Sequence, residues 1–388
     1  MWKWAQGAVA SVTGAAEPEY GAEAFHSIDK TVAGQNPFGE LTAKDYLWVQ
    51  PPQSHVETQT FYFHSDECFG FAQLIHSNPV NLAYTSQFTF LLRKTDDPDF
   101  RVWGSHRLDQ AEVTGDGYDF KAENFRISLN KERTAYKFNG LCGEDIQVDL
   151  EFKRVADGFK IGKDGFSKYG TDPNNPWGTM RHIFWPRCDV TGIIVVKSKS
   201  LLLDVSENGR GLFVMALQGM KPHHLAARWN FLDFQGPTVS VTAMEFTTPP
   251  SYGCQKSSIG AVVKDGKLLM TAVNVDIRHT ATQQDDKEDA NWPMPTSIQF
   301  VLEGPQPNGD LAKPVKVEVS GDLPILADRV DVMSELPSFV KRVASGLSGA
   351  RPIIYQFYNE LTAKITVNGE TQEEKGRAFN EATFISEI

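Results

Sequence analysis

Short runs of alternating apolar and polar residues dominate the chain from about residue 55 onward. Residues 146–153 show the pattern most clearly, since every second side chain is apolar and each residue between is polar or charged. Because successive side chains of a strand point to opposite faces, this run predicts a strand with one buried face. β-Branched or aromatic runs bounded by turn residues predict further strands at 57–63, 69–76, 84–92, 190–196, 212–217, 229–234, 239–247, 353–358 and 361–367.

The clearest predicted turn is Asp265-Gly266, which lies between apolar runs at 259–264 and 267–273. This dipeptide favours the type I′ turn of a two-residue hairpin, because both residues tolerate a positive φ. One internal helix is predicted at 336–347, where apolar residues recur at helical spacing. Many short strands in two halves of similar size predict an all-β protein with two antiparallel barrels or sandwiches.

An aromatic segment at 176–187, here called the central strap, lies between the two halves. Its two tryptophans, its phenylalanine and its two prolines suit a buried connection between domains, and they suit equally well one aromatic core strand with a turn. The predicted organisation is a helix at 1–14, a Gly- and Pro-rich tether at 15–53, a first barrel at 54–188 ending in the strap, and a second barrel at 189–388.

Residues 1–13 place their apolar side chains on one face of a helical wheel. A 14-residue helix is about 21 Å long, which suits an interfacial helix and is too short to cross a bilayer. Docking of this helix on the protein's own core is the alternative. A secretory signal peptide is not predicted, because the apolar residues are interrupted. The predicted membrane-binding residues are Met1, Trp2, Trp4, Ala5, Ala8, Val9 and Val12.

Composition and charge exclude several classes of protein. A formal net charge of -11 and a pI near 5.4 disfavour a general nucleic-acid binder and docking on strongly anionic membrane. The four cysteines are far apart and show no CxxC spacing, so neither a zinc site nor a disulfide framework is indicated, and a reducing cytoplasm is the simplest location. No apolar run approaches the length of about 20 residues that a spanning helix needs.

Signatures of catalysis and metal binding are missing from the sequence. It holds no GxSxG elbow, P-loop, HExxH or EF-hand loop, so no catalytic residue, metal or cofactor is predicted. His223 and His224 are adjacent, and in a strand their rings would point to opposite faces. A structural or hydrogen-bonding role is therefore the better hypothesis for them than metal binding.

Two glutamines lie within aromatic strand patterns. Gln59 would share a face with Phe61 and Phe63, and Gln73 would share a face with Phe71. If these faces are inward, each amide needs a partner inside an apolar interior. A lipid that carries amide or hydroxyl groups would supply one, and a bond to backbone at a strand end is the alternative for either residue.

Several motifs together resemble the fungal survival factor family. They are AEPEYG (16–21), HVETQTFYF (55–63), GFAQLIHSN (70–78), TSQFTF (85–90), the central strap, QGMKPHH (218–224), WNFLDFQ (229–235) and MEFTTP (244–249). The resemblance covers nearly the whole chain. It implies tandem lipocalin-like (calycin) barrels, survival under oxidative and cold stress, and a link to sphingolipid metabolism.

The resemblance also implies ceramide carriage between endoplasmic reticulum and Golgi, with an acetylated Met1 on a helix that holds the protein at Golgi-type membrane. Trp2 departs from the leucine expected at this position. Because methionine before a large apolar residue keeps the initiator, acetylation remains expected. The family supplies no catalytic residues.

The leading hypothesis is a soluble ceramide-transfer protein. Its candidate lipid-binding residues come from both halves and are Gln59, Phe61, Phe63, Phe71, Gln73, Trp185, His224, Trp229 and Phe231. One alternative is a calycin-fold hydratase or cyclase acting on a polyene or terpenoid, with His182, His224 or Asp233 as the acid. Another is a scaffold without ligand, whose barrels are filled by their own side chains.

Overall fold

The computed structural model describes residues 19–78, 83–220, 224–287, 292–332 and 352–388. They form two compact units, each assembled from separate stretches of the chain. The first contains the described residues of 40–160 and 179–220, and the second those of 19–39, 161–178 and 224–388. The sequence instead predicted one division near residue 188. The helices predicted at 1–14 and 336–347 lie outside the described residues.

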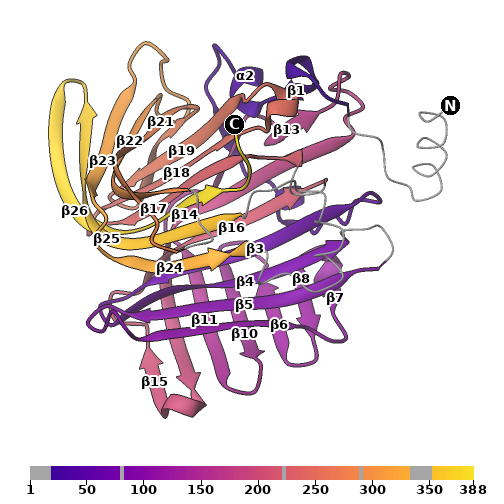
Figure 1. The fold of residues 1–388 in the computed structure, drawn as a ribbon, viewed down its shortest axis with the longest axis vertical. Coiled ribbons are helices and arrows are strands. Elements are labelled where there is room, and N and C mark those ends of the chain that lie inside the picture. The colour runs from indigo at the N-terminus through magenta and orange to yellow at the C-terminus, as the bar shows by residue number, and fades with distance from the viewer. Residues whose placement is uncertain (1–18, 79–82, 221–223, 288–291, 333–351) are drawn as a thin grey trace. The chain divides into compact units, whose positions relative to one another are not determined.

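The first unit is an antiparallel sheet with the strand order β6-β5-β4-β3-β16-β14-β11-β10-β9-β8-β7, and β15 pairs with β14 (Figure 1). Short 3-10 helices lie at Ala43–Tyr46, Gly115–Gly117 and Lys197–Lys199. The strands are β3 (His55–His64), β4 (Cys68–Asn78), β5 (Thr85–Lys94), β6 (Arg101–Arg107), β7 (Glu112–Thr114), β8 (Asp119–Ala122), β9 (Phe125–Leu129), β10 (Ala135–Cys142), β11 (Ile146–Arg154), β12 (Phe159–Ile161), β14 (Gly178–Val196), β15 (Leu201–Asp204) and β16 (Arg210–Gln218).

This sheet curls so that its two arms face each other. Phe61 of β3 lies 5.5 Å from Tyr136 of β10, measured between ring centroids, although β16, β14 and β11 separate these strands in the sheet. Phe88 of β5 similarly lies 5.2 Å from Phe138 of β10. The predicted alternation in β11 is confirmed, because its four apolar side chains lie in the shared hydrophobic core.

The central strap belongs to a core strand, the second of its two predicted interpretations. Residues 178–187 form the first half of β14, which runs from Gly178 to Val196. Its pairing with β16 shifts between Trp185 and Cys188, so a β-bulge contains Pro186. The bulge changes which positions point inward, from Ile183 and Trp185 before it to Cys188 and Val190 after it. A proline is tolerated there because a bulge leaves one residue outside the regular ladder.

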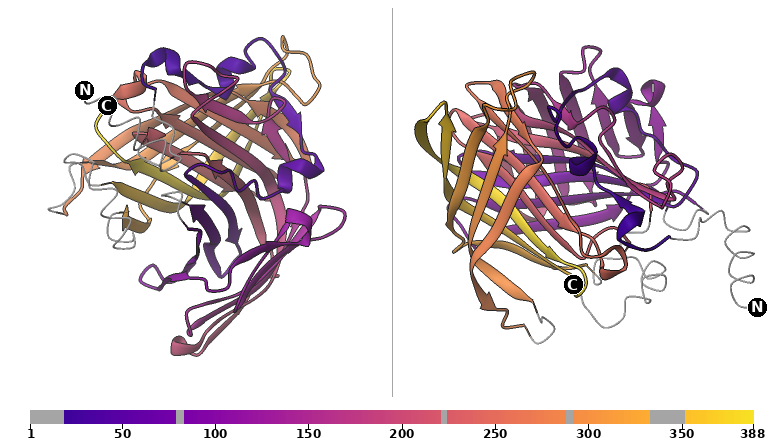
Figure 2. Two further views of the ribbon diagram at one scale, coloured as in Figure 1. Left: turned by 90° about the vertical axis from the view of Figure 1, so that its right-hand side faces the viewer. Right: turned by 90° about the horizontal axis from the view of Figure 1, so that it is seen from above.

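The second unit has the strand order β20-β19-β18-β17-β26-β25-β23-β22-β21, with β24 on β25. Its orange and yellow strands curve around their own core in both views of Figure 2. Helical turns lie at Ala22–Ala24, Ile28–Thr31 (α2) and Pro250–Tyr252. The strands are β1 (Phe25–His26), β2 (Phe38–Glu40), β13 (Phe166–Tyr169), β17 (Arg228–Gln235), β18 (Val239–Thr247), β19 (Lys256–Lys264), β20 (Lys267–Ala272), β21 (Asn274–Gln284), β22 (Pro293–Gly304), β23 (Val315–Asp322), β24 (Leu326–Asp331), β25 (Ile353–Val367) and β26 (Glu370–Phe384).

Two tight hairpins organise this unit. The predicted turn at Asp265-Gly266 is confirmed, with φ of 51° and 72° and Lys264 paired with Lys267. A second turn of the same kind, Asn368-Gly369, joins β25 to β26. The prediction of two strands at 353–358 and 361–367 is wrong, because β25 is continuous and pairs with β24 along its first half and with β23 along its second.

The described part of the predicted tether is packed more tightly than its composition suggests. Phe25 and Ile28 are buried in the second unit, and Tyr46 and Trp48 are buried in the core of the first. No helix among the described residues has the length and apolar character to cross a membrane.

Candidate functional site

Side chains on the inner face of the first unit form rows across β4, β3, β16 and β14, because paired residues of neighbouring strands share a face. From one end inward, the first row is His76, Glu57, Leu217 and Arg181; the second is Leu74, Gln59, Met215 and Ile183; the third is Ala72, Phe61, Phe213 and Trp185. The inner face thus changes from polar to aromatic within two rows.

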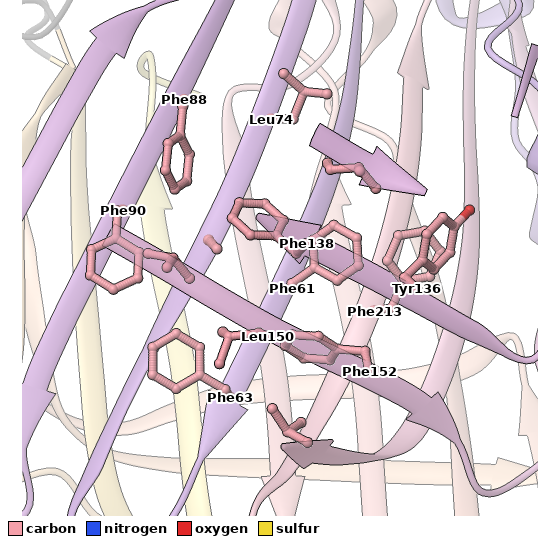
Figure 3. Packing of buried hydrophobic residues seen from close by; sticks show 14 of the residues in the cluster. Phe61, Phe63, Leu74, Phe88, Phe90, Tyr136, Phe138, Leu150, Phe152 and Phe213 are labelled. Atoms are coloured by element: carbon pink, nitrogen blue, oxygen red, sulfur yellow. The ribbon is translucent and has the colours of Figure 1, made fainter. Parts of the chain in front are cut away.

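The aromatic region is filled by the protein's own side chains. Phe61, Phe63 and Trp185, all predicted ligand-binding residues, are 0% exposed. Figure 3 shows Phe61 and Phe63 among rings carried by strands that cross one another, and the ring of Phe61 lies 4.9 Å from that of Phe213. The Trp185 indole Nε1 donates to the hydroxyl of Tyr46 at 3.2 Å. These predicted residues therefore form a packed core at this level.

Gln59 lies in the second row, between the polar first row and the aromatic third row. Its side chain is 0% exposed, and its amide Nε2 lies 3.8 Å from Met215 Sδ, a weak acceptor. Within the described part of the chain, its Oε1 has no hydrogen-bond partner. An acceptor of this kind is costly to bury, by about 1–3 kcal/mol.

Two buried histidines at the polar end, His55 and His76, are neutral at physiological pH. Burial lowers the pKa of His55, and burial together with the nearby His55 charge lowers the pKa of His76 to about 4. His55 Nδ1 donates to the carbonyl of Gln53 at 2.7 Å, which makes its Nε2 an acceptor. That Nε2 is buried and has no partner among the described residues. His55 Nε2 and Gln59 Oε1 are therefore two acceptors that the described part of the chain leaves unpaired.

Glu57 holds a segment of chain across the polar end of the interior. Its two carboxylate oxygens accept the backbone N–H groups of Val49 and Gln50, each at 2.8 Å. Burial raises the pKa of Glu57, although these two bonds and the Arg181 charge act in the opposite direction. Gln50, at φ 47°, also donates from its side-chain amide to His76 Nε2 at 3.2 Å. We call residues 47–50 the mouth segment.

A buried ion cluster lies beside the mouth segment. The Asp45 carboxylate accepts bonds from Lys160 Nζ at 2.8 and 2.9 Å and from Arg181 Nη2 at 2.5 Å. Burial acts to raise the pKa of Asp45, but the bonds from Lys160 and Thr42 and the Arg181 charge outweigh it and hold that pKa below its usual value. With Glu57, the cluster has two positive and two negative charges, so no uncompensated charge faces the interior.

A cavity of about 10 Å³ remains at this end, lined by residues that include Glu57, Arg181 and Met215. This volume suits about one water molecule. A ligand larger than a water molecule would need the mouth segment or the rings behind it to move.

The remaining candidates lie on the other sheet face of the first unit or belong to the second unit. Phe71 and Gln73 lie on the opposite face of β4, where Gln73 Nε2 donates to Thr60 Oγ1 at 2.8 Å. Trp229 and Phe231 belong to the second unit, on the face of β17 opposite the core residues Leu232 and Phe234.

His224 also belongs to the second unit, and its ring lies 5.5 Å from that of Trp177. The predicted membrane-binding residues and Met1 lie outside the described residues. Sequence reasoning missed His55, Glu57 and His76, although His55 and Glu57 precede Gln59 on the same face of one strand.

The proposed acids of the enzyme alternative are also dispersed. His182 lies in the first unit on the face of β14 opposite Trp185, and burial followed by the Arg181 charge lowers its pKa to about 3. Asp233 lies in the second unit and accepts a bond from Gln235 Nε2 at 2.6 Å. Among residues whose placement is described, no three His, Cys, Asp or Glu side chains are arranged to hold a metal ion.

Comparison with known sequences identifies the chain's relatives. The model of the Svf1 family matches residues 2–386. Ceramide-binding protein SVF1 of Yarrowia lipolytica is 44% identical over 403 residues and is covered completely, as is this chain. The protein of the same name from Candida albicans is 42% identical over 394 residues, again with both chains fully covered.

Solved structures confirm the fold class. The crystal structure of CghA superposes with a TM-score of 0.59 at 10% identity and covers 86% of this chain and 89% of its own. Kievitone hydratase from Nectria haematococca gives a TM-score of 0.55 at 11% identity, with 85% and 89% covered. At such identities the likeness shows a shared calycin-like fold and nothing about chemistry.

Replacing Glu57 by glutamine will loosen the mouth segment. The amide keeps one acceptor oxygen and turns a donor toward the second backbone N–H, so one hydrogen bond is lost. We expect unfolding in urea to require about 1–3 kcal/mol less free energy than in the wild type. Glu123→Gln, at an exposed position of the same unit, is the control. Equal losses in the two variants would show that Glu57 does not hold the segment.

The buried neutral His76 will make stability depend on pH. Its pKa is about 4 in the folded chain and 6.5 in the reference state, so the unfolded state takes up a proton first. The wild type should therefore lose stability as pH falls from 6.5 toward 4, by at most about 1.4 kcal/mol per pH unit from this group. The raised pKa of Glu57 changes stability with pH in the opposite direction. The measurement is therefore the free energy of unfolding of the wild type minus that of His76→Asn at each pH. Parallel curves would contradict the assignment.

Proposed function

Because the chain belongs to the Svf1 family, we propose that it binds ceramide in the interior of its first unit and carries it without chemical change. The names of its relatives support ceramide as the ligand. The observation that carries the assignment to this interior is a pair of buried acceptors, Gln59 Oε1 and His55 Nε2, which have no partner within the described ranges.

The chemistry of ceramide matches these acceptors. Ceramide presents one amide N–H and two hydroxyl donors on an otherwise apolar molecule. One of these donors can satisfy the Gln59 carbonyl, and the buried indole Nε1 of Trp48, which has no partner among the described residues, can donate to the amide carbonyl. Trp48 packs against His76 with 5.8 Å between ring centroids, so it lies at the same end of the interior. A triacylglycerol has no donor and would leave both acceptors unpaired.

The electrostatics of this end favour a neutral head group. Both histidines carry depressed pKa values and are uncharged at neutral pH. The charged groups of the ion cluster are already engaged with one another. An anionic lipid would therefore meet no free cation here to offset its desolvation, whereas an uncharged amide and diol would be accepted.

Loading requires a conformational change under this proposal. The aromatic rows are closely packed and the cavity at the polar end is only about 10 Å³, so the acyl chains enter by displacing the mouth segment. The two Glu57 bonds are the connections that opening would break. A carrier that opens reversibly can both take up and release its lipid.

The proposal extends to transfer from endoplasmic reticulum to Golgi, with residues 1–13 as a reversible membrane contact. The apolar face that begins at Trp2 and Trp4 supports this step. With Lys3 as its only charged side chain, the helix binds through apolar burial, which suits a protein that must leave its donor membrane. Support of sphingolipid metabolism under oxidative and cold stress is the physiological role we propose.

Two glutamines provide a matched test of the ceramide site. In protein purified from a eukaryotic host, Gln59→Leu should reduce co-purified ceramide at least tenfold, because it removes an acceptor that ceramide satisfies. Gln73→Leu changes the same residue type on the opposite sheet face and should retain wild-type ceramide. The measurement is mass spectrometry of extracted lipid per mole of folded protein. Equal ceramide in the two variants would exclude Gln59 from the site.

The membrane contact is tested by Trp2→Glu. Removing one buried tryptophan costs about 2 kcal/mol of membrane affinity, so recovery in the membrane fraction should fall more than tenfold. Ser11→Glu, on the polar side of the same wheel, should leave recovery nearly unchanged. Circular dichroism should show the same strand content in all three proteins. Unchanged membrane recovery of Trp2→Glu would refute the helix assignment.

A further inference from the structure

An asparagine inside the second unit has no hydrogen-bond partner among the residues that the structure describes. Asn380 lies on β26 between Ala378 and Ala382, and all three side chains point to the inner face. It is 0% exposed. Neither Oδ1 nor Nδ2 has a partner within the described ranges.

The neighbours of Asn380 cannot supply one. In the ladder it is paired with Leu232 of β17 on one side and with Phe357 of β25 on the other, and both belong to the hydrophobic core of this unit. Their backbone groups are already used in the strand pairing. Along β26, the flanking alanines end at Cβ, so no side chain on that strand covers the amide.

A second asparagine on the same inner face shows how a structural amide is satisfied. Asn359 of β25 is 3% exposed. Its Oδ1 accepts the backbone N–H of Ile325 at 2.9 Å, and its Nδ2 donates to the Ile325 carbonyl at 3.0 Å. Both atoms are paired, and the side chain fastens one segment to another. Asn380 makes no such connection, so fastening does not explain its place in the core.

The amide defines the chemistry of a ligand. One carboxamide presents a donor and an acceptor side by side, and its complement is a group with an acceptor beside a donor, such as a hydroxyl next to an amide. Leu232 and Phe357 flank Asn380 in the sheet and are apolar, so the rest of the ligand must be apolar as well. We propose that the second unit has its own binding position, in which Asn380 holds the hydroxyl and amide end of a neutral lipid.

This inference goes beyond the proposed site at Gln59 and does not depend on it, because the two residues belong to different units. It predicts that one chain carries up to two lipid molecules. If Asn380 holds one of them, each position can be emptied while the other remains loaded.

The test uses a ceramide analogue with a diazirine beside its amide, cross-linked by light to full-length protein, with labelled peptides identified by mass spectrometry. Wild-type protein should carry label in the peptides of β17, β25 or β26 around Leu232, Phe357 and Asn380. Asn380→Leu should lower that label at least tenfold and leave label near Gln59 unchanged. Gln59→Leu should lower the label near Gln59 and leave the label around Asn380 unchanged.

Label confined to the first unit, or label around Asn380 that survives Asn380→Leu, would overturn the proposal. Wild-type protein that is labelled around Asn380 but not near Gln59 would count against the ceramide site of the first unit alone, so the two failures are distinguishable. Leucine has the branched shape of asparagine and removes the unpaired amide, so Asn380→Leu should unfold at no lower temperature than wild type. If this variant does not fold, the labelled peptides of the wild type still show whether the second unit binds the analogue.

Discussion

Packing around Phe61 is the constraint on which the first unit depends. Its ring meets rings from β10, β11 and β16, so one side chain connects the two arms of a curled sheet. Aromatic contacts of this kind add about 0.5–1.5 kcal/mol each to the area they bury. The rings fill the middle of the interior, and the charged groups Glu57 and Arg181 lie in the row at one end of it. The location of the candidate site follows from this packing.

The polar end combines satisfied charges with unsatisfied neutral groups. Asp45 is paired with Lys160 and Arg181, and the Glu57 carboxylate, which is engaged by the mouth segment, brings the cluster to two positive and two negative charges. Among the described residues, the neutral groups of this end without a hydrogen-bond partner include the Gln59 carbonyl, one nitrogen of His55 and the indole N–H of Trp48. Such an arrangement favours a ligand with hydroxyl and amide donors over an ion or a wholly apolar molecule. The same principle applies to Asn380, where a buried amide again lacks a partner.

Local patterns predicted much of the fold. The alternation in β11 and the Asp265-Gly266 turn depend only on neighbouring residues, and both were found from sequence. The Asn368-Gly369 turn carried the same signal and was overlooked. The break predicted within β25 was wrong because pairing with β23, β24 and β26 carries one strand through Asn359-Glu360. Tertiary pairing outweighs the local preference of two polar residues.

The site was less predictable because it depends on register and on contacts distant in sequence. Gln59 and Gln73 lie in similar aromatic runs, and many residues on both faces of β3 and β4 are buried, so alternation could not show which amide points inward. The role of Glu57 depends on its hydrogen bonds to the backbone of residues 49 and 50, and the sequence predicted those residues to belong to a loose tether. Each unit is assembled from separate stretches of the chain, and no local sequence pattern predicts such a division.

The central claim is that a lipid enters the first unit beneath the mouth segment. The most direct measurement is hydrogen exchange at the backbone amides of Val49 and Gln50, with the protein free of lipid and loaded with ceramide. Both amides are bound to Glu57 in the structure described here and should exchange slowly without lipid. Displacement of the segment predicts faster exchange in the loaded protein. Unchanged slow exchange at full ceramide occupancy would contradict the account.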